Sequence, residues 1–231
     1  MPRALLLAAG KGERMRPLTD TVPKPLLHAG GRPLIEWQVE RLVCGGFREI
    51  VVNHSHLGSM IEAALGDGAR FGAAIRYSHE PRALETAGGV VQALPLLGGE
   101  PFAVVSADIH TNFDYGSLMP RLQAITRDPA RHAAHFVLVD NPAFHPAGDM
   151  ALSDGLVARE GPRLTYGNIS VFHPGPFHDL PGGTALKLFP WAYQLVEAGR
   201  VTGERFTGSW DNIGTPEQLA ALDRRLAQTQ R

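Results

Sequence analysis

Ala4-Leu5-Leu6-Leu7-Ala8-Ala9-Gly10-Lys11-Gly12 is the segment from which the fold of this chain is most directly predicted. Six consecutive apolar or small residues, Ala4–Ala9, have the length of a buried β-strand. The run is too short for a membrane helix or for the apolar part of a signal peptide. Two glycines and several cations follow, so we expect a strand that ends in a turn with an accessible backbone.

Further strands and helices alternate after this segment. Apolar runs of strand length recur at 49–53, 74–78 and 102–106, and helical spacing of apolar residues recurs at 34–43, 57–65 and 86–94. Strands that alternate with helices imply a largely parallel sheet with helices on both faces. The predicted fold class is therefore α/β and Rossmann-like.

The second half of the chain is more mixed. We expect strands at Phe136–Val139 and Leu164–Phe172, a partly helical segment at Leu186–Val196, and a terminal helix that begins after Thr215. The composition shows no break typical of a linker. The chain is therefore predicted to form one domain, 1–231.

Charge and cysteine content restrict the function classes. The 22 basic and 23 acidic residues give a formal net charge of −1, which argues against a protein that binds nucleic acid through a positive field. The single cysteine, Cys44, cannot form an internal disulfide, and no cysteine cluster is present to bind a metal. We expect a cytoplasmic monomer or small homo-oligomer that associates with neither nucleic acid nor membrane.

The glycine-rich turn is a candidate phosphate site. Backbone N–H groups near Gly10 and Gly12 can surround phosphate oxygens, and Lys11, Arg14 and Lys24 can add charge-assisted hydrogen bonds. The segment fits neither a P-loop nor a dinucleotide fingerprint, because Met15 stands where the latter needs a third glycine.

The full segment resembles the signature Gly-x-Gly-x-Arg-(Met/Leu)-x-Pro-Leu-Thr, followed by Pro-Lys-Pro, of the sugar-1-phosphate nucleotidyltransferases. Ten positions between Gly10 and Pro25 match it. The resemblance continues through 84–89, 106–108 and 210–215, and it is strongest to the N-acetylmuramate-1-phosphate uridylyltransferases of cell-wall recycling, on stretches such as 137–142 and 169–171.

This resemblance implies that a sugar 1-phosphate attacks the α-phosphorus of a nucleoside triphosphate, with Mg²⁺ as cofactor. The products are a nucleotide-sugar and pyrophosphate. The resemblance also implies a nucleotide-binding half at about 1–110 and a sugar-phosphate-binding half at about 111–231. The implied acceptor is N-acetylmuramate 1-phosphate, and the implied catalytic residues are Arg14, Lys24 and Asp108. Nucleotide contacts are implied for Ala8, Ala9, Gly10, Lys11, Gly12, Glu80 and Gly88.

The base and the acceptor sugar are assigned by the same resemblance. A carboxylate only accepts hydrogen bonds, so Glu80 favours uracil or thymine, which carry a ring N3–H. UTP is therefore the expected nucleotide. The residues expected on the sugar side are Thr86, Asp149, Glu160, Asn168 and Lys187.

The metal site departs from the family pattern at one position. The family places a second metal-binding Asp where this chain has Asn212, and Asp211 stands one residue earlier. If this segment is extended, the two side chains point to opposite faces. We expect Asp108 and Asn212, rather than Asp211, to face Mg²⁺, which gives weak metal binding without nucleotide.

Two other functions stay open. Asp108-Ile109-His110 is similar to the Asp-x-Asp/His metal motif of glycosyltransferases that use nucleotide-sugars, although Pro23-Lys24-Pro25 argues against that class. A nucleotide-binding regulatory domain without catalysis is the other alternative, because of Asn212.

Overall fold

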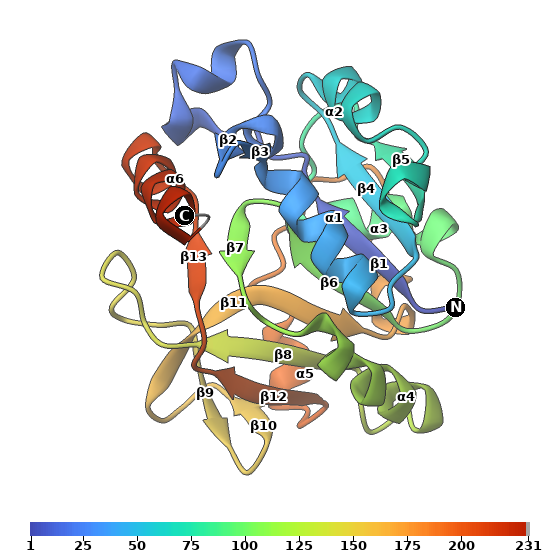
Figure 1. The fold of residues 1–231 in the computed structure, drawn as a ribbon. Coiled ribbons are helices and arrows are strands. Elements are labelled where there is room, and N and C mark those ends of the chain that lie inside the picture. Colours follow the sequence, from blue (N-terminus) through green and yellow to red (C-terminus); the bar gives the residue numbers. More distant parts are fainter. Residues whose placement is uncertain (230–231) are drawn as a thin grey trace.

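The computed structural model describes residues 1–229, and a nine-stranded sheet runs through them in the order β5-β4-β1-β6-β11-β8-β12-β10-β9 (Figure 1). The four strands of the first half are all parallel, with β1 between β4 and β6. They span Arg3–Leu7 (β1), Glu49–His54 (β4), Ala74–His79 (β5) and Phe102–Ser106 (β6). Their carboxyl ends share one edge, where open α/β sheets bind ligands.

The second half extends this sheet with mixed pairings. The strand β11 is antiparallel to β6 and β8, while β12 is parallel to β8 and antiparallel to β10. The α/β class is confirmed, whereas the parallel character is confined mainly to the first half. The added strands are Ala134–Val139 (β8), Met150–Ser153 (β9), Leu156–Ala158 (β10), Arg163–Phe172 (β11) and Val201–Phe206 (β12).

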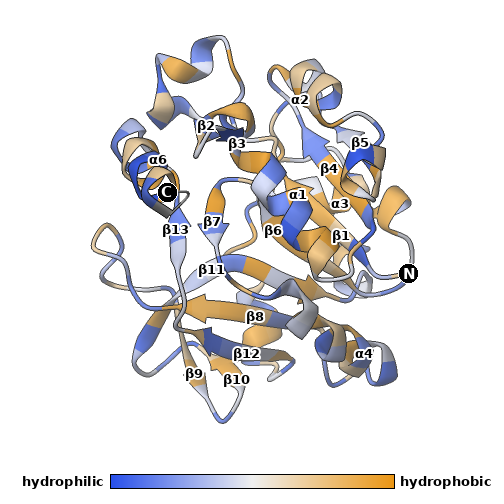
Figure 2. Ribbon diagram, in the orientation of Figure 1, coloured by the Kyte–Doolittle hydropathy of each residue, from blue (hydrophilic) through white to orange (hydrophobic). Residues whose placement is uncertain are grey.

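Helices cover both faces of the sheet, as expected. On one face, α1, α2 and α4 bury residues such as Val39, Ile61 and Ile125, and on the other α3 and α5 bury Val90 and Val196. Figure 2 shows the hydrophobic residues concentrated on the central strands. The helices are Leu34–Cys44 (α1), Gly58–Leu65 (α2), Glu85–Leu97 (α3), Met119–Arg127 (α4), Tyr193–Glu197 (α5) and Pro216–Thr229 (α6).

Two small sheets position segments beside the carboxyl edge. The strands β7 (Ile109–Thr111) and β13 (Trp210–Asn212) pair antiparallel, and the Ile213 N–H donates to the Asp108 carbonyl at 2.8 Å. The hairpin of β2 (His28–Ala29) and β3 (Arg32–Pro33) packs against α6 through Ala29 and Leu222. These contacts join the end of the chain to the end of β6.

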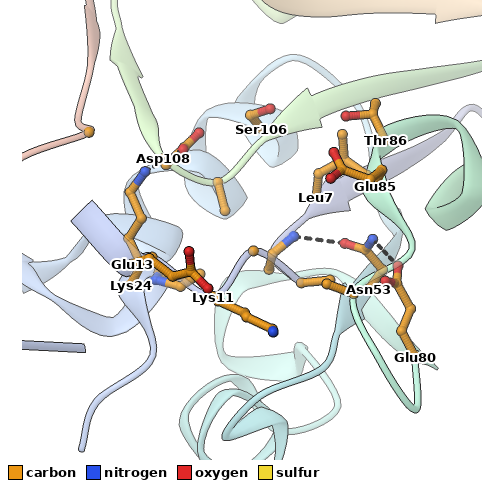
Figure 3. Close-up of a pocket in the computed structure, with 18 of the residues that line it drawn as sticks. Leu7, Lys11, Glu13, Lys24, Asn53, Glu80, Glu85, Thr86, Ser106 and Asp108 are labelled. Atoms are coloured by element: carbon orange, nitrogen blue, oxygen red, sulfur yellow. Dashed lines mark hydrogen bonds and ion pairs between the residues drawn. The ribbon is translucent and has the colours of Figure 1, made fainter. Parts of the chain in front are cut away.

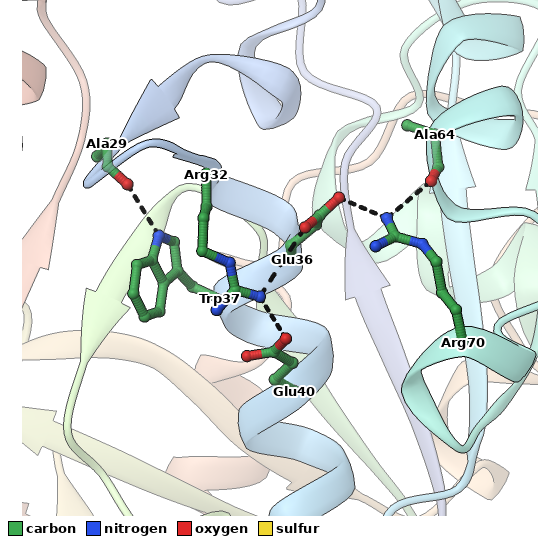
Figure 4. Close-up of polar contacts among 7 residues, drawn as sticks. All are labelled: Ala29, Arg32, Glu36, Trp37, Glu40, Ala64 and Arg70. Atoms are coloured by element: carbon green, nitrogen blue, oxygen red, sulfur yellow. Dashed lines mark hydrogen bonds and ion pairs between the residues drawn. The ribbon is translucent and has the colours of Figure 1, made fainter.

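Polar contacts on α1 hold this hairpin in place (Figure 4). The indole of Trp37 donates to the Ala29 carbonyl at 3.0 Å, and Arg32 pairs with Glu40. Arg70 reaches Glu36 at 2.5 Å from the turn that precedes β5. Exposed ion pairs add little stability, so their main effect here is to orient the chain around α1.

The segment at 186–196, predicted to be partly helical, is helical only in its last part. Only Tyr193–Glu197 forms a helix there. The Leu186 N–H donates to the Leu84 carbonyl at 2.9 Å, and the Leu186 carbonyl accepts from Ala87 at 2.9 Å. The apolar residues near Leu186 are therefore used to dock an extended segment onto α3. Within residues 1–229, no helix combines the length and apolarity needed to cross a membrane.

Candidate active site

A cleft of about 840 Å³ lies at the carboxyl ends of β1 and β6 and beside the first turn of α3 (Figure 3). Ten of the predicted site residues line it. They are Ala8, Ala9, Gly10, Lys11, Gly12, Arg14, Lys24, Glu80, Thr86 and Asp108. Residues from positions 8 to 108 thus meet at the carboxyl edge of the parallel sheet, which the alternation of strands and helices in the sequence predicts.

The glycine turn is shaped by close packing at Gly12. Its φ of +65° is in the left-handed region, and a Cβ there would lie 2.9 Å from Cγ2 of Thr19 and 3.1 Å from Cβ of Lys24. The Thr19 hydroxyl also donates to the Gly12 carbonyl at 2.8 Å. Gly10 has open space around its Cα. Gly12 therefore brings the turn against Lys24, and Gly10 leaves the backbone accessible to a ligand.

Lys24 and Asp108 form an ion pair in this cleft. Lys24 Nζ lies 2.5 Å from Oδ2 of Asp108, and Lys24 is 8% exposed. Lys24 begins a short 3-10 helix after Pro23, and Asp108 follows β6 by two residues. At this edge of the sheet, the buried ammonium can attract an anionic phosphate, and the neighbouring carboxylate can attract a cation.

Arg14 adds a second cation to the same side of the cleft. It is exposed, and its Nη2 lies 3.2 Å from the position that a Cβ on Gly214 would occupy. Gly214 itself lines the cleft. The glycine after Ile213 therefore leaves room for the guanidinium.

A chain of hydrogen bonds fixes the opposite end of the cleft. The Ala8 N–H donates to Oδ1 of Asn53 at 2.7 Å, and the Asn53 amide donates to Oε1 of Glu80 at 2.6 Å. Oε2 of Glu80 accepts from the Leu84 N–H at 2.8 Å. Because the Ala8 N–H can only donate, the orientation of the Asn53 amide is determined. The hydrogen bonds tie the turn after β1 and the loop before α3 to the end of β4.

These hydrogen bonds restrict how Glu80 can contact a nucleobase. The side chain is 1% exposed and both of its oxygens already accept hydrogen bonds. Burial raises the pKa of Glu80, against the hydrogen bonds from Leu84 and Asn53 that lower it. An N–H group of a nucleobase can therefore bind Glu80 only through a carboxylate lone pair that the hydrogen bonds from Asn53 and Leu84 do not occupy. The Ala8 N–H is likewise already used, by Asn53.

Comparison with known proteins identifies the family of this chain. The model of the nucleotidyl transferase family matches residues 3–143, which include the cleft residues up to Asp108. The chain belongs to the nucleotidyl transferase family.

Two curated relatives match nearly the whole chain of this nucleotidyl transferase. The N-acetylmuramate alpha-1-phosphate uridylyltransferase of Neisseria meningitidis serogroup B is 46% identical over 92% of this chain and 93% of its own. The enzyme of the same name from Caulobacter vibrioides is 35% identical over 97% of each chain. A crystal structure of UDP-glucose pyrophosphorylase without ligand has a TM-score of 0.75 over 100% of both chains, at 17% identity, which shows the same fold.

The metal ligands expected from the resemblance are only partly brought together. The Asp211 carboxylate is bound by the guanidinium of Arg225 in α6. Asn212 lies opposite Ile109 in the β7–β13 pair, and Ile109 is the residue that follows Asp108. Adjacent residues of a strand point to opposite faces, so Asp211 and Asn212 do not share a face. Asn212 does not line the cleft. Among residues 1–229, no group of three His, Cys, Asp or Glu side chains is arranged to hold a metal.

Mg²⁺ nevertheless fits the donors at Asp108. Mg²⁺ prefers oxygen ligands and commonly binds through one or two carboxylates together with substrate phosphates, and the Asp108 carboxylate lines the cleft. His110 does not line the cleft: it is 7% exposed, and its ring packs 5.7 Å from that of Trp37. The Asp-x-His similarity to glycosyltransferases therefore has no counterpart in the geometry.

The sugar-side candidates are spread over the second half. Thr86 lines the cleft, and Asn168 lies in the irregular part of β11 with a φ of +57°, next to the residues that pair with β6. Oδ1 of Asp149 lies 3.0 Å from His145, and Oδ2 accepts from the Tyr166 N–H at 2.8 Å. Glu160 is exposed after β10. Asp149 and Glu160 are outside the cleft lining.

Gly88 and Lys187 lie at the wall where the two halves meet. The Gly88 N–H donates to the Leu186 carbonyl at 3.1 Å, and a Cβ on Gly88 would lie 2.3 Å from the Thr184 carbonyl. Gly88 therefore permits the docking of this segment and does not line the cleft, in contrast to its expected nucleotide contact. Lys187 follows directly after the docked Leu186.

Several residues that line the cleft were not predicted from the sequence, among them Asn53, Arg82, Glu85 and Gly214. Asn53 could have been found, because it is a polar residue near the carboxyl end of an apolar strand next to β1. Glu85 and Gly214 lie in the stretches 84–89 and 210–215 that carry the resemblance, whereas Arg82 has no local pattern that distinguishes it from a residue of a surface turn. Arg82 donates to the Gly183 carbonyl at 3.3 Å and so links the cleft to the second half.

Proposed function

We propose that this nucleotidyl transferase joins UTP to N-acetylmuramate 1-phosphate, with release of pyrophosphate, in cell-wall recycling in the cytoplasm. The observation that carries this proposal is the Lys24–Asp108 pair beside the glycine turn in one cleft. The names of the two relatives that match over nine-tenths of the chain support the choice of substrates. We also propose that residues 1–231 act as one catalytic domain.

The reaction makes simple demands on the protein. An oxygen of the sugar phosphate, already ionised, attacks the α-phosphorus of UTP, and the bond from that phosphorus to the bridging oxygen of pyrophosphate breaks. No general base is needed. The protein must hold two anions in line and neutralise charge on the phosphoryl oxygens.

Lys24 and Arg14 supply this neutralisation. Lys24 is held where the glycine turn meets Asp108, so its ammonium can reach the phosphate groups of both substrates. Arg14 and Lys11 line the same cleft and would contact the triphosphate. In this proposal Asp108, with Asn212 next to it, would hold Mg²⁺, which supplies further positive charge to the phosphates when bound.

The base would lie toward Asn53 and Glu80. Uracil offers an N3–H to a carboxylate lone pair, and adenine and cytosine lack a ring donor there. The hydrogen bonds from Asn53 and Leu84 hold Glu80 in a fixed position for this contact. Selection of UTP by Glu80 and the surrounding backbone is therefore part of the proposal.

The test is an assay of pyrophosphate release with every pairing of four nucleoside triphosphates and several sugar 1-phosphates, with Mg²⁺ present. We expect the highest kcat/KM for UTP with N-acetylmuramate 1-phosphate. Equal use of ATP would contradict the base assignment. A higher kcat/KM for glucose 1-phosphate would contradict the acceptor assignment.

A further inference from the structure

Glu85 has an unusual backbone conformation at the wall of the cleft. It is the first residue of α3, with a φ of +61°. A residue other than glycine in this left-handed backbone conformation costs on the order of 1 kcal/mol or more, and such residues cluster at functional sites. Glu85 is exposed and lines the cleft.

The residues around Glu85 hold it in this conformation. The Leu84 N–H donates to Glu80, and the Leu84 carbonyl accepts from Leu186. Two residues after Glu85, the Ala87 N–H donates to the Leu186 carbonyl. The backbone on both sides is therefore fixed by bonds to other segments, which maintain the strained φ.

The carboxylate of Glu85 has no partner in the described part of the protein. Within residues 1–229, its oxygens accept no hydrogen bond and form no ion pair, whereas both oxygens of Glu80 are occupied. Figure 3 shows Glu85 beside Thr86 and Leu7, toward Ser106 and away from Lys24 and Asp108. A strained residue thus presents a free carboxylate to the cleft.

The position of Glu85 favours the acceptor over the nucleotide. The docked segment around Leu186 comes from the second half and contacts the residues on both sides of Glu85. Ser106, at the same end, ends β6 next to β11, where Ile169 pairs with Val105. Glu85 therefore lies where the nucleotide-binding half meets the second half.

We infer that Glu85 is a specificity residue that accepts hydrogen bonds from hydroxyl or amide N–H groups of the acceptor sugar. This inference rests on the proposed function. Both substrates carry anionic phosphates, which a carboxylate repels, so Glu85 can contribute only through neutral donors. Glu85 lies away from the cationic end of the cleft and beside the segment from the second half, which favours contact with the sugar ring.

The test compares Glu85→Gly, Glu85→Gln and the control Asp154→Gly. Asp154 also has a positive φ, of 49°, but lies in the exposed turn between β9 and β10. Both glycine variants relieve backbone strain, and only Glu85→Gly removes a carboxylate from the cleft. The measurements are the thermal midpoint and the KM values for UTP and for N-acetylmuramate 1-phosphate.

For Glu85→Gly we expect a KM for the sugar phosphate raised about tenfold or more, as for loss of a charged hydrogen bond. The KM for UTP should change by less than about twofold, the thermal midpoint should not fall, and Glu85→Gln should lie between. An unchanged sugar-phosphate KM, or a rise confined to UTP, would overturn the inference. So would a lowered midpoint with both KM values raised. If the wild-type protein uses no sugar phosphate at all, the proposed function itself fails.

Discussion

Lys24 places its charge where water has little access, at 2.5 Å from Asp108. Its ammonium acts on charge that develops in the transition state, so Lys24→Ala should lower kcat by about 10²–10³-fold. Circular dichroism and thermal unfolding should show a folded protein. Lys11→Ala, which removes an exposed cation from the same turn, should have a smaller effect. Near-normal pyrophosphate release by Lys24→Ala would exclude Lys24 from the mechanism.

Asp211 and Asn212 differ in what holds them. Because Arg225 binds both oxygens of Asp211, Asp211→Asn should leave the Mg²⁺ concentration for half-maximal rate nearly unchanged. Asn212→Asp adds a carboxylate beside Asp108 and should lower that concentration, since Mg²⁺ binds carboxylates better than amides. A Mg²⁺ titration of both variants decides this. A requirement sensitive to position 211 and insensitive to 212 would show that Asp211 is the ligand.

The first turns of α3 pack directly on the hydrogen-bond chain of Asn53 and Glu80. A Cβ on Gly89 would lie 2.7 Å from Nδ2 of Asn53 and 2.7 Å from Oε1 of Glu80. Gly89→Ala should therefore lower the thermal midpoint and raise the KM for UTP. Helix propensity alone predicts that Gly89→Ala would instead stabilise the protein by about 1 kcal/mol.

Gly99→Ala is the matched control for this prediction. Gly99 follows α3, and a Cβ added to it would meet nothing within 4 Å, so the change should be nearly neutral. A Gly89→Ala variant that is more stable than the wild type, with an unchanged KM for UTP, would show that the chain of hydrogen bonds does not position the nucleotide.

The sequence predicts best the strands and helices in which apolar residues recur at regular spacing. The runs at 49–53, 74–78 and 102–106 correspond to β4, β5 and β6 within one residue. Of these, β4 and β6 are buried parallel strands, and β5 is a partly exposed parallel strand at the edge of the sheet. The strand β7 has three residues and β12 contains Gly203 and charged side chains, so neither shows a strand pattern. Of the partly helical segment predicted at Leu186–Val196, only the part from Tyr193 is helical, because docking onto α3 decides the conformation around Leu186.

The candidate site divides in the same way. The glycine turn, Lys24 and Asp108 are close in the structure as expected, because each follows a strand or a turn of fixed geometry. Asp149, Glu160 and Lys187 depended on the mixed second half, whose pairings cannot be derived from periodicity. The engagement of Glu80 by Asn53 is a contact between the end of β4 and the loop after β5, and no local pattern predicts it.

The extended sheet of the second half carries a charged contact that makes stability depend on pH. Glu204 of β12 lies 3.8 Å from His135 and 3.3 Å from Arg121. The interaction with His135, and then that with Arg121, lowers the pKa of Glu204 from its usual 4.5. A lowered carboxyl pKa stabilises the folded state above about pH 4.5, and this contribution is lost as the pH falls through the folded-state value.

Glu204→Gln should accordingly lower the free energy of unfolding by on the order of 1 kcal/mol at pH 7. The difference from the wild type should shrink in denaturant titrations below about pH 4.5. Glu197→Gln, which breaks the exposed pair with Arg159, should have a much smaller effect at any pH. If the free energies of unfolding of Glu204→Gln and the wild type differ by the same amount from about pH 7 to about pH 3, the lowered pKa of Glu204 is contradicted.

The central claim is that one cleft brings a nucleoside triphosphate and a sugar phosphate together for transfer. The most direct measurement is the mass-spectrometric yield of nucleotide-sugar, with pyrophosphate counted in parallel, from wild-type protein, UTP, N-acetylmuramate 1-phosphate and Mg²⁺. We predict one UDP-sugar for each pyrophosphate, with neither product formed when either substrate is omitted. Binding of UTP without turnover of any sugar phosphate, or release of pyrophosphate without a nucleotide-sugar, would contradict the claim.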